Sequence, residues 1–158
     1  MSKPNPEIRI AKTAKDFIAA KKLILEYADW LNIDLSFQDF ENEINYLQKI
    51  YAEPTGGLTL AIVNDKAVGV AGIRKFEEKV CELKRMYVKE PFRNIGIGKL
   101  ILQYSIDYAR KLNYNSIKLD TDSSMKAAIK LYLAHGFKET EPYRFNPFET
   151  VRYFELGL

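Results

Sequence analysis

A stretch of seven residues has the composition of an anion-binding turn. It reads Arg93-Asn94-Ile95-Gly96-Ile97-Gly98-Lys99, and it opens a helix predicted over residues 96–112. Glycines at two of these positions let a ligand approach the main chain where a Cβ would block it. Free amides at a helix start carry the positive end of the helix dipole and suit phosphate groups. The turn therefore predicts a pyrophosphate-binding site.

Three phosphate-binding motifs were compared with this turn. A P-loop requires G-x-x-x-x-G-K-[ST], but leucine follows Lys99 and no glycine lies five residues before Gly98. A dinucleotide fingerprint requires G-x-G-x-x-G, and isoleucine stands where its third glycine belongs. The remaining pattern is R-x-x-G-x-G, which Arg93, Gly96 and Gly98 match. Taken alone, this pattern fits a helix cap with incidental glycines equally well.

A second segment, across one predicted strand, decides between these interpretations. Residues 127–137 read AAIKLYLAHGF. The two segments together resemble the GNAT family of acetyl-CoA-dependent N-acetyltransferases. The first is similar to the coenzyme-binding motif of that family, and the second to its A-x-x-L-Y-x-x-x-G-F motif. The resemblance covers essentially the full chain and implies acetyl-CoA as co-substrate, with no metal.

The resemblance also implies where the coenzyme binds. The residues expected to hold it are Met86, Tyr87, Val88, Arg93, Asn94, Ile95, Gly96, Ile97, Gly98 and Lys99. Two departures from the family pattern bear on this site. Asn94 stands where members often have glycine, and asparagine tolerates unusual backbone angles better than most residues. Met125 stands where many members have asparagine, which removes one expected contact to the pantetheine arm.

Two residues are predicted to act in catalysis. Tyr132 aligns with the family's motif tyrosine, whose hydroxyl faces the sulfur, and a phenol there suits protonation of the departing thiolate. A tyrosine used only for helix packing is the alternative. Glu82 is the candidate base. It resembles a glutamate that serves as the base, through a water, in some members of the family. The even spacing of strand residues predicts that Glu82, Lys84, Met86 and Val88 share one face.

The assignment of a base leaves alternatives open. Glu82 could instead pair with Lys84, Arg85 or another cation. Asp120 and Asp122, at the end of a predicted parallel strand, are further candidates. Water and bulk ionisation without a dedicated base are the remaining alternative.

The acceptor side is predicted from position in the fold. In this family it is framed by the first two helices and the last hairpin, which brings Trp30, Tyr143 and Arg144 into consideration. The hairpin resembles a bacterial GNAT subgroup with a P-Y-x-x-N-P loop and a closing E-L. Arg144 between two prolines suits a bidentate contact to an acceptor carboxylate, and a solvated arginine is the alternative. Aromatic residues here fit a lid or a homodimer contact.

The elements that must position these residues follow from hydrophobic periodicity and turn signals. Strands are expected over residues 7–11, 58–63, 67–76, 80–88, 114–120, 137–141 and 150–156, and helices over 13–31, 37–51, 96–112 and 125–134. This order predicts an antiparallel meander in the middle of the chain. The resemblance implies a mixed α+β fold with a mostly antiparallel sheet, splayed between the strands ending near Val88 and Asp120.

Composition limits the alternatives. A chain of 158 residues fits one domain, residues 1–158, since domains commonly run about 100–200 residues. Its net charge of +3 is too small to favour a nucleic-acid partner. One cysteine and one histidine exclude a multi-cysteine or multi-histidine metal centre. With no signal-like or membrane-spanning stretch, a cytoplasmic location is expected.

The prediction is thus an N-acetyltransferase that acts on a primary amine of a small molecule. Acetylation of a protein N-terminus or lysine is the alternative among enzymes. A coenzyme A-binding domain without catalysis is the alternative among binding proteins.

Overall fold

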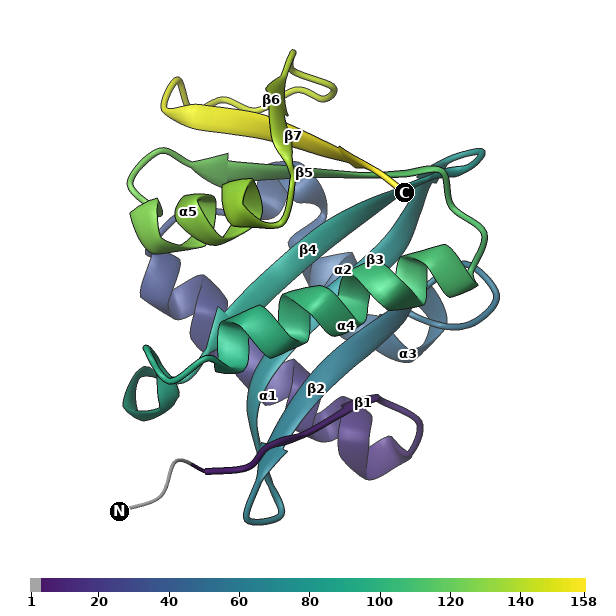
Figure 1. Cartoon of the computed structure of the whole chain (residues 1–158), viewed down its shortest axis with the longest axis vertical. Helices are drawn as coiled ribbons and strands as arrows, with labels where there is room; N and C mark the ends of the chain where they lie inside the picture. The colour runs from purple at the N-terminus through teal and green to yellow at the C-terminus, as the bar shows by residue number, and fades with distance from the viewer. Residues whose placement is uncertain (1–3) are drawn as a thin grey trace.

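One seven-stranded sheet forms the centre of the molecule, in the order β1-β2-β3-β4-β5-β7-β6 (Figure 1). This computed structural model describes residues 4–158. The strands are β1 (Glu7–Ile10), β2 (Gly57–Val63), β3 (Lys66–Glu77), β4 (Val80–Val88), β5 (Ser116–Asp122), β6 (Lys138–Thr140) and β7 (Val151–Gly157). The pairing of β4 with β5 is parallel and the other pairings in these residues are antiparallel. The predicted α+β fold and meander are confirmed.

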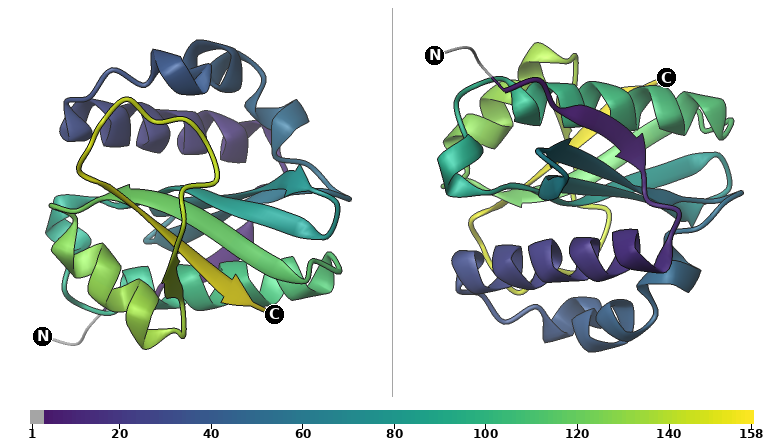
Figure 2. Two further views of the ribbon diagram at one scale, coloured as in Figure 1. Left: turned by 90° about the horizontal axis from the view of Figure 1, so that it is seen from above. Right: turned by 90° about the horizontal axis from the view of Figure 1, so that it is seen from below.

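Helices cover both faces of this sheet. They are α1 (Ala14–Leu31), α2 (Phe40–Asn45), α3 (Leu47–Ile50), α4 (Ile97–Lys111) and α5 (Lys126–Ala134). Figure 2 shows α1, α2 and α3 on one face and α4 and α5 on the other. The segment between β6 and β7 leaves the sheet and reaches toward the layer of α1 and α2 (Figure 2).

The sheet opens between its two central parallel strands. Residues 80–82 of β4 pair with residues 116–118 of β5, and the pairing goes no further. Beyond that point β4 keeps its pairing with β3, and β5 keeps its pairing with β7. The two strands therefore diverge toward Val88 and Asp122, which confirms the predicted splay.

A β-bulge changes which face the second half of β4 presents. The register shifts between Val70 and Gly72 of β3, so that three steps on β4 match two on its partner. Arg85 takes a positive φ of 60° at this point. After the bulge Met86 and Val88 pack against the α4 side of the sheet, in the cluster that contains Leu83. The prediction that Met86 and Val88 share a face with Glu82 and Lys84 is therefore wrong, because an extra residue resets the alternation.

The first helix begins as predicted. Thr13 accepts a hydrogen bond from the Asp16 amide, and the Asp16 carboxylate accepts one from the Thr13 amide. Arg9 of β1 donates to both Asp16 oxygens, at 2.6 and 2.9 Å. The Arg9 guanidinium thereby holds the pKa of that carboxyl well below its usual range. The capping box and the ion pair tie the start of α1 to the edge of the sheet.

The second helix is not continuous, contrary to the single helix expected over residues 37–51. A 3-10 turn spans Ser36–Gln38, and α2 and α3 are separated at Tyr46. Asp39 has a left-handed backbone with φ 57°, which a continuous helix cannot contain. Glu43 of α2 is 1% exposed, because Arg85 and Tyr51 hold its carboxylate inside the molecule.

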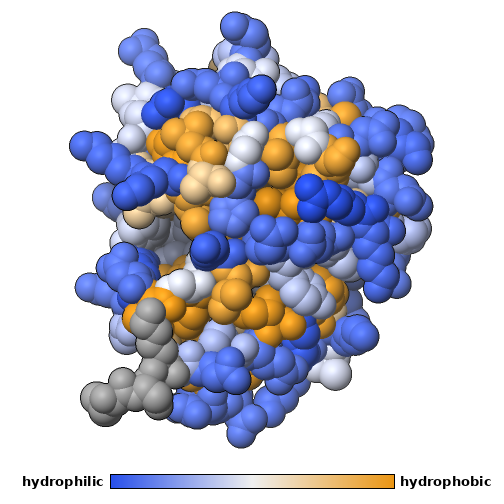
Figure 3. Space-filling model, viewed as in Figure 1, coloured by the Kyte–Doolittle hydropathy of each residue, from blue (hydrophilic) through white to orange (hydrophobic). Residues whose placement is uncertain are grey.

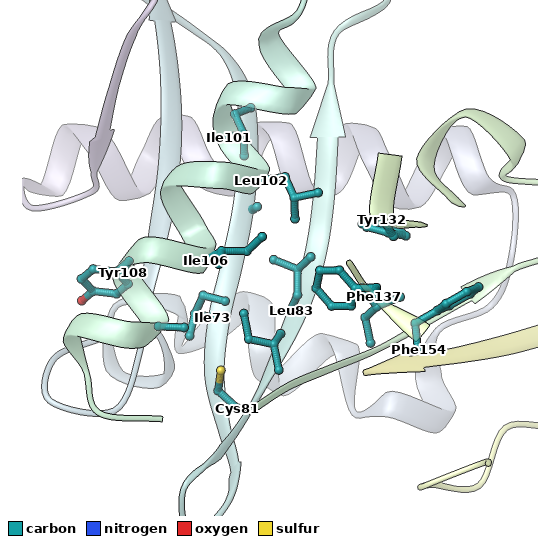
Figure 4. Packing of buried hydrophobic residues seen from close by; sticks show 14 of the residues in the cluster. Ile73, Cys81, Leu83, Ile101, Leu102, Ile106, Tyr108, Tyr132, Phe137 and Phe154 are labelled. Carbon is teal, nitrogen blue, oxygen red and sulfur yellow. The ribbon is translucent and has the colours of Figure 1, made fainter. Parts of the chain in front are cut away.

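Apolar packing joins the helices to the sheet in two clusters. One lies under α4 and α5 and includes Ile101, Leu102, Tyr132, Phe137 and Phe154 (Figure 4). The other lies under α1 and includes its buried aliphatic residues. Full burial of one aliphatic side chain contributes about 1.5–3 kcal/mol, so these clusters hold the splayed strands in place.

The outer face over α4 and α5 shows apolar surface between hydrophilic side chains (Figure 3). Within residues 4–158, no helix combines the length and the apolar character needed to cross a membrane.

Candidate active site

A pocket lies where β4 and β5 diverge. Its lining includes Lys84 of β4, Asp120 of β5 and Tyr132 of α5. Tyr27 from α1 lines it from the opposite layer, and Phe148 comes from the segment between β6 and β7. Two strands, two helices and one connecting segment therefore contribute to one cavity.

The predicted coenzyme turn joins β4 to α4. Asn94 has a φ of 63° and Gly96 a φ of 93°, so two residues hold left-handed backbone before the helix begins. This supports the expectation that asparagine can replace the glycine at position 94. Within residues 4–158, the N–H groups of residues 94–99 donate to no backbone carbonyl. A Cβ placed on Gly96 would meet nothing within 4 Å, which leaves open space over the turn.

Arg93 is fixed at the start of this turn by aromatic side chains. Its guanidinium carbon lies 4.7 Å from the centre of the Trp30 ring and 5.3 Å from that of Tyr87. Its Nε donates to the Val88 carbonyl at 2.8 Å. Trp30, expected on the acceptor side, is thus placed beside the coenzyme turn, and it is not part of the pocket lining. A residue at the end of α1 can lie on the acceptor side or beside the coenzyme turn, and the sequence does not distinguish these two positions.

Tyr132 lies between the pocket and the core. It is 6% exposed, and its ring packs 5.7 Å from Phe137 and 6.5 Å from Phe154, measured between ring centroids. None of residues 4–158 hydrogen bonds to its hydroxyl. Burial raises the pKa of this phenol, so that it keeps its proton throughout the ordinary pH range.

Glu82 binds the hairpin instead of lining the pocket. Tyr143 donates to its Oε2 at 2.8 Å, and Arg144 donates to its Oε1 at 2.7 Å. Lys84 Nζ lies 3.9 Å from the same Oε1. Glu82 is 1% exposed. These contacts fit the alternative in which Glu82 pairs with cations better than they fit a general base, because both oxygens already have partners. They also commit Tyr143 and Arg144, expected on the acceptor side, to Glu82.

Two neighbouring cations on β4 differ in their partners. Arg85 is held by two hydrogen bonds to Glu43, at 2.9 and 3.0 Å. Lys84 donates only to the neutral Oε1 of Gln38, at 3.0 Å. Both side chains are 4% exposed. Burial lowers the pKa of Lys84 to about 8, with the nearby Glu82 partly opposing that effect. Lys84 therefore carries a buried charge without a close carboxylate of its own.

The two aspartates of β5 also differ. Asp122 accepts hydrogen bonds from Ser124 and Thr150, which lower the pKa of its carboxyl and fix it in a local turn. Both aspartates line the pocket, but Asp120 has an Oδ2 that is buried without a hydrogen-bond partner in residues 4–158. A buried carboxylate oxygen without a partner is costly unless a ligand completes it.

Comparison with known proteins identifies the family. The model of the family described as "Acetyltransferase (GNAT) family" matches residues 24–137.

This chain belongs to the GNAT family.

A fission yeast (Schizosaccharomyces pombe) relative, called an uncharacterized N-acetyltransferase, is 35% identical over all of this chain and 99% of its own length. The zebrafish (Danio rerio) N-acetylaspartate synthetase is 32% identical over 78% of this chain and 43% of its own length. Among solved structures, a GNAT acetyltransferase from Staphylococcus aureus has a TM-score of 0.78 at 24% identity, covering 96% of this chain and 99% of that one. The chain is an acetyl-CoA-dependent N-acetyltransferase.

The GNAT coenzyme fits the features of this site. The edge of β4 that faces the splay lacks a β5 partner after residue 82, and an amide-bearing pantetheine arm can pair with such an edge. The free amides of residues 94–99 suit a pyrophosphate. Among residues 4–158 there is no group of three His, Cys, Asp or Glu residues placed to hold a metal ion.

Several residues of the pocket were not singled out from the sequence. Gln38 and Tyr27 line the pocket, and Glu43 holds Arg85, which also lines it. All three come from helical segments whose apolar stripes gave no sign of a polar role. Lys84 was named only as a partner for Glu82. The sequence did contain a signal for a polar site. Two charged residues alternate with apolar ones on the first half of β4, and a central strand has no water-exposed face on which to place them.

Proposed function

We propose that this N-acetyltransferase acetylates the primary amine of a small molecule. The observation that carries the proposal is the contact that encloses the pocket. Phe148, from the segment between β6 and β7, packs edge-on against Phe37, with ring centroids 5.7 Å apart. Both residues line the pocket, so the two layers meet across its acceptor side. A closed side favours a small acceptor over a polypeptide, which needs an open groove.

The coenzyme is assigned to the other side of the pocket. Residues 93–99 would hold its pyrophosphate through main-chain amides, and Met86, Tyr87 and Val88 would pair with its pantetheine arm. The Arg93 guanidinium, which stacks on Trp30 and Tyr87, adds a fixed positive charge at the same end. Bound acetyl-CoA supplies the activated acetyl group as a thioester.

Tyr132 is assigned as the proton donor. The neutral amine nitrogen of the acceptor forms a bond to the acetyl carbon, and the carbon–sulfur bond breaks. The sulfur leaves as a thiolate, which takes the Tyr132 hydroxyl proton, while the amine nitrogen loses a proton to water or a nearby carboxylate. Burial raises the pKa of Tyr132, so the group is protonated before the reaction begins, as a donor must be. The same shift makes the phenol a weaker acid, so its hydroxyl acts first by a hydrogen bond to the departing sulfur, and the proton that it gives up is replaced from solvent.

The name of one relative supports a small acceptor. The zebrafish protein is called N-acetylaspartate synthetase, so its product is an acetylated amino acid. Membership of the bacterial subgroup with the P-Y-x-x-N-P loop stays a prediction, as do a homodimer and a cytoplasmic location.

The proposal is tested by mass spectrometry of products. The full chain is incubated with acetyl-CoA and either pooled small amines and amino acids or a library of peptides with free N-termini and lysines. We expect acetylated products in the small-molecule pool and release of free coenzyme A at a matching rate. Products confined to the peptide library would replace the proposal by a protein acetyltransferase. Coenzyme binding without product in either pool would favour a binding domain without catalysis.

A further inference from the structure

Two charged groups that line the pocket lack a close ionic partner among residues 4–158. On the side of β4 and β5 that faces the hairpin segment, Glu82 is bound by Arg144, at 2.7 Å. Glu43 is bound by Arg85, at 2.9 Å. The first of the two groups is the Lys84 ammonium, whose nearest carboxylate oxygen is Glu82 Oε1 at 3.9 Å, an oxygen already bound by Arg144. The second is the Asp120 carboxylate, whose Oδ2 is buried without a hydrogen-bond partner in residues 4–158. Each lines the pocket, and among residues 4–158 they form no ion pair with each other within 4 Å.

These two groups are carried by the two strands that diverge. Lys84 lies on β4 just beyond the last residue that pairs with β5, and Asp120 lies on β5 beyond the matching point. The splay therefore separates one buried positive charge from one buried negative charge across the pocket. Pairing of each with an opposite charge on a ligand would remove the cost of leaving a polar group unsatisfied.

We propose that the acceptor is zwitterionic, an amino acid or a similar amino carboxylate, with its ammonium on Asp120 and its carboxylate on Lys84. This inference rests on the proposed function and names the substrate class of the same site. Such a ligand adds no net charge to the pocket, so both buried groups are neutralised together. A simple amine would satisfy Asp120 and leave Lys84 with the amide oxygen of Gln38 and the more distant Glu82 carboxylate, at 3.9 Å.

The same assignment explains why Arg144 does not bind the acceptor. Its guanidinium is bound to Glu82, and it is not part of the pocket lining. Moving it to an acceptor would leave Glu82, which is 1% exposed, with a buried charge and a weaker partner. Lys84 needs no such exchange. Gln38 beside it accepts one of its protons and leaves two for a carboxylate.

Asp120 also places the amine for reaction. Tyr132 lines the same pocket from α5, on the side where the coenzyme is assigned. An ammonium held by Asp120 Oδ2 can give its proton to that carboxylate and become the neutral nucleophile. Lys84 is then a specificity-determining residue, and Asp120 acts on both specificity and rate.

The experiment compares acceptors that differ only in the carboxylate. Each standard amino acid and its carboxamide are tested with acetyl-CoA, and kcat/KM is measured for the pair with the fastest turnover. The amide makes the amine less basic, which by itself favours acetylation, so a preference for the carboxylate form reports recognition. In Lys84→Met we expect the ratio of the two kcat/KM values to fall about 10- to 100-fold.

Three variants accompany this measurement. Lys84→Arg keeps the charge and should retain most of the preference. Asp120→Asn should lower kcat/KM for acid and amide alike, while calorimetry shows unchanged acetyl-CoA binding. Lys66→Met, at the exposed first residue of β3, should change nothing. Equal use of acids and amides by the wild type, or an equal loss of both in Lys84→Met, overturns the inference.

Failure of the proposed function gives a different result. If acetyl-CoA binds but no amine is acetylated, the inference is decided by thermal-shift measurements with each amino acid in the presence of coenzyme A. A rise in Tm that Lys84→Met abolishes supports the zwitterion site. No rise with any amino acid overturns it.

Discussion

The Arg144 guanidinium donates to Glu82 Oε1 over 2.7 Å, and this contact fastens the segment between β6 and β7 to the middle of β4. Tyr143 adds a second bond to the other oxygen of the same carboxylate, at 2.8 Å. The segment continues to Phe148, which lies against Phe37 across the pocket. The enclosure of the acceptor side thus depends on a buried ion pair as well as on aromatic packing.

We predict that Arg144→Ala lowers the free energy of unfolding by about 1.5–3 kcal/mol, because a charge-assisted hydrogen bond is lost and Glu82 stays buried. Denaturant unfolding measures this loss. The matched control is Arg152→Ala, whose pair with Glu139 is exposed and should contribute only about 0–1 kcal/mol. Equal effects of the two substitutions would mean that the Glu82 contact adds no special stability.

Gly98 gives a test of the coenzyme turn. A Cβ here meets Leu131 Cδ2 only at 3.7 Å, an ordinary contact, so a side chain fits the protein itself. We predict that Gly98→Val folds normally and weakens acetyl-CoA binding more than about 100-fold, equivalent to about 2.7 kcal/mol. Isothermal calorimetry measures it, with Gly157→Val as the control at a site that has open space. Normal binding by Gly98→Val would move the pyrophosphate to another position.

For Tyr132→Phe we predict a turnover about 10-fold lower or more, with the dissociation constant of acetyl-CoA nearly unchanged, because only a transition-state contact is removed. Steady-state kinetics and calorimetry separate the two effects. Tyr104→Phe, on the exposed face of α4, is the control. Full turnover of Tyr132→Phe with an unchanged rate-limiting step would exclude this hydroxyl from the chemistry.

The acceptor preference should depend on pH through Lys84. Burial and the neighbouring Arg85 and Arg144 lower the pKa of Lys84, while Glu82 and Asp120 raise it, and the result is about 8. Lys84 is therefore charged below pH 8 and loses its proton as the pH rises through that value. We predict that the KM for an amino acid increases above about pH 8 relative to the KM for its carboxamide, and that Lys84→Arg abolishes the trend. Parallel KM profiles in the wild type would contradict this.

Local signals predicted most of the fold. The capping box at Thr13 and Asp16, the Pro–Gly break after residue 53 and the alternating strands depend on neighbours in sequence, and the structure contains them as expected. The single helix expected over residues 37–51 is interrupted by the left-handed backbone of Asp39 and again at Tyr46. Glu43 pairs with Arg85, which is 42 residues away, and no local pattern reports that pair.

The site was predictable in part. Two short motifs predicted the turn at residues 93–99 and the position of Tyr132. Each motif lies within one turn or one helix, so its spacing depends only on local structure. The partners of Glu82 and the isolation of Asp120 depend on how the last hairpin crosses the sheet. Residue types at those positions are compatible with several roles, and only the contacts distinguish them.

The bulge at Arg85 divides β4 into two parts whose side chains make different contacts. Before it, Glu82 and Lys84 contact the segment between β6 and β7 and the 3-10 turn. After it, Met86 and Val88 pack against the cluster under α4, and Met86 also lines the pocket. Replacing Lys84 therefore leaves the coenzyme turn and its packing untouched. With the roles proposed above, a change of acceptor needs a substitution only before the bulge, and the residues assigned to the coenzyme stay as they are.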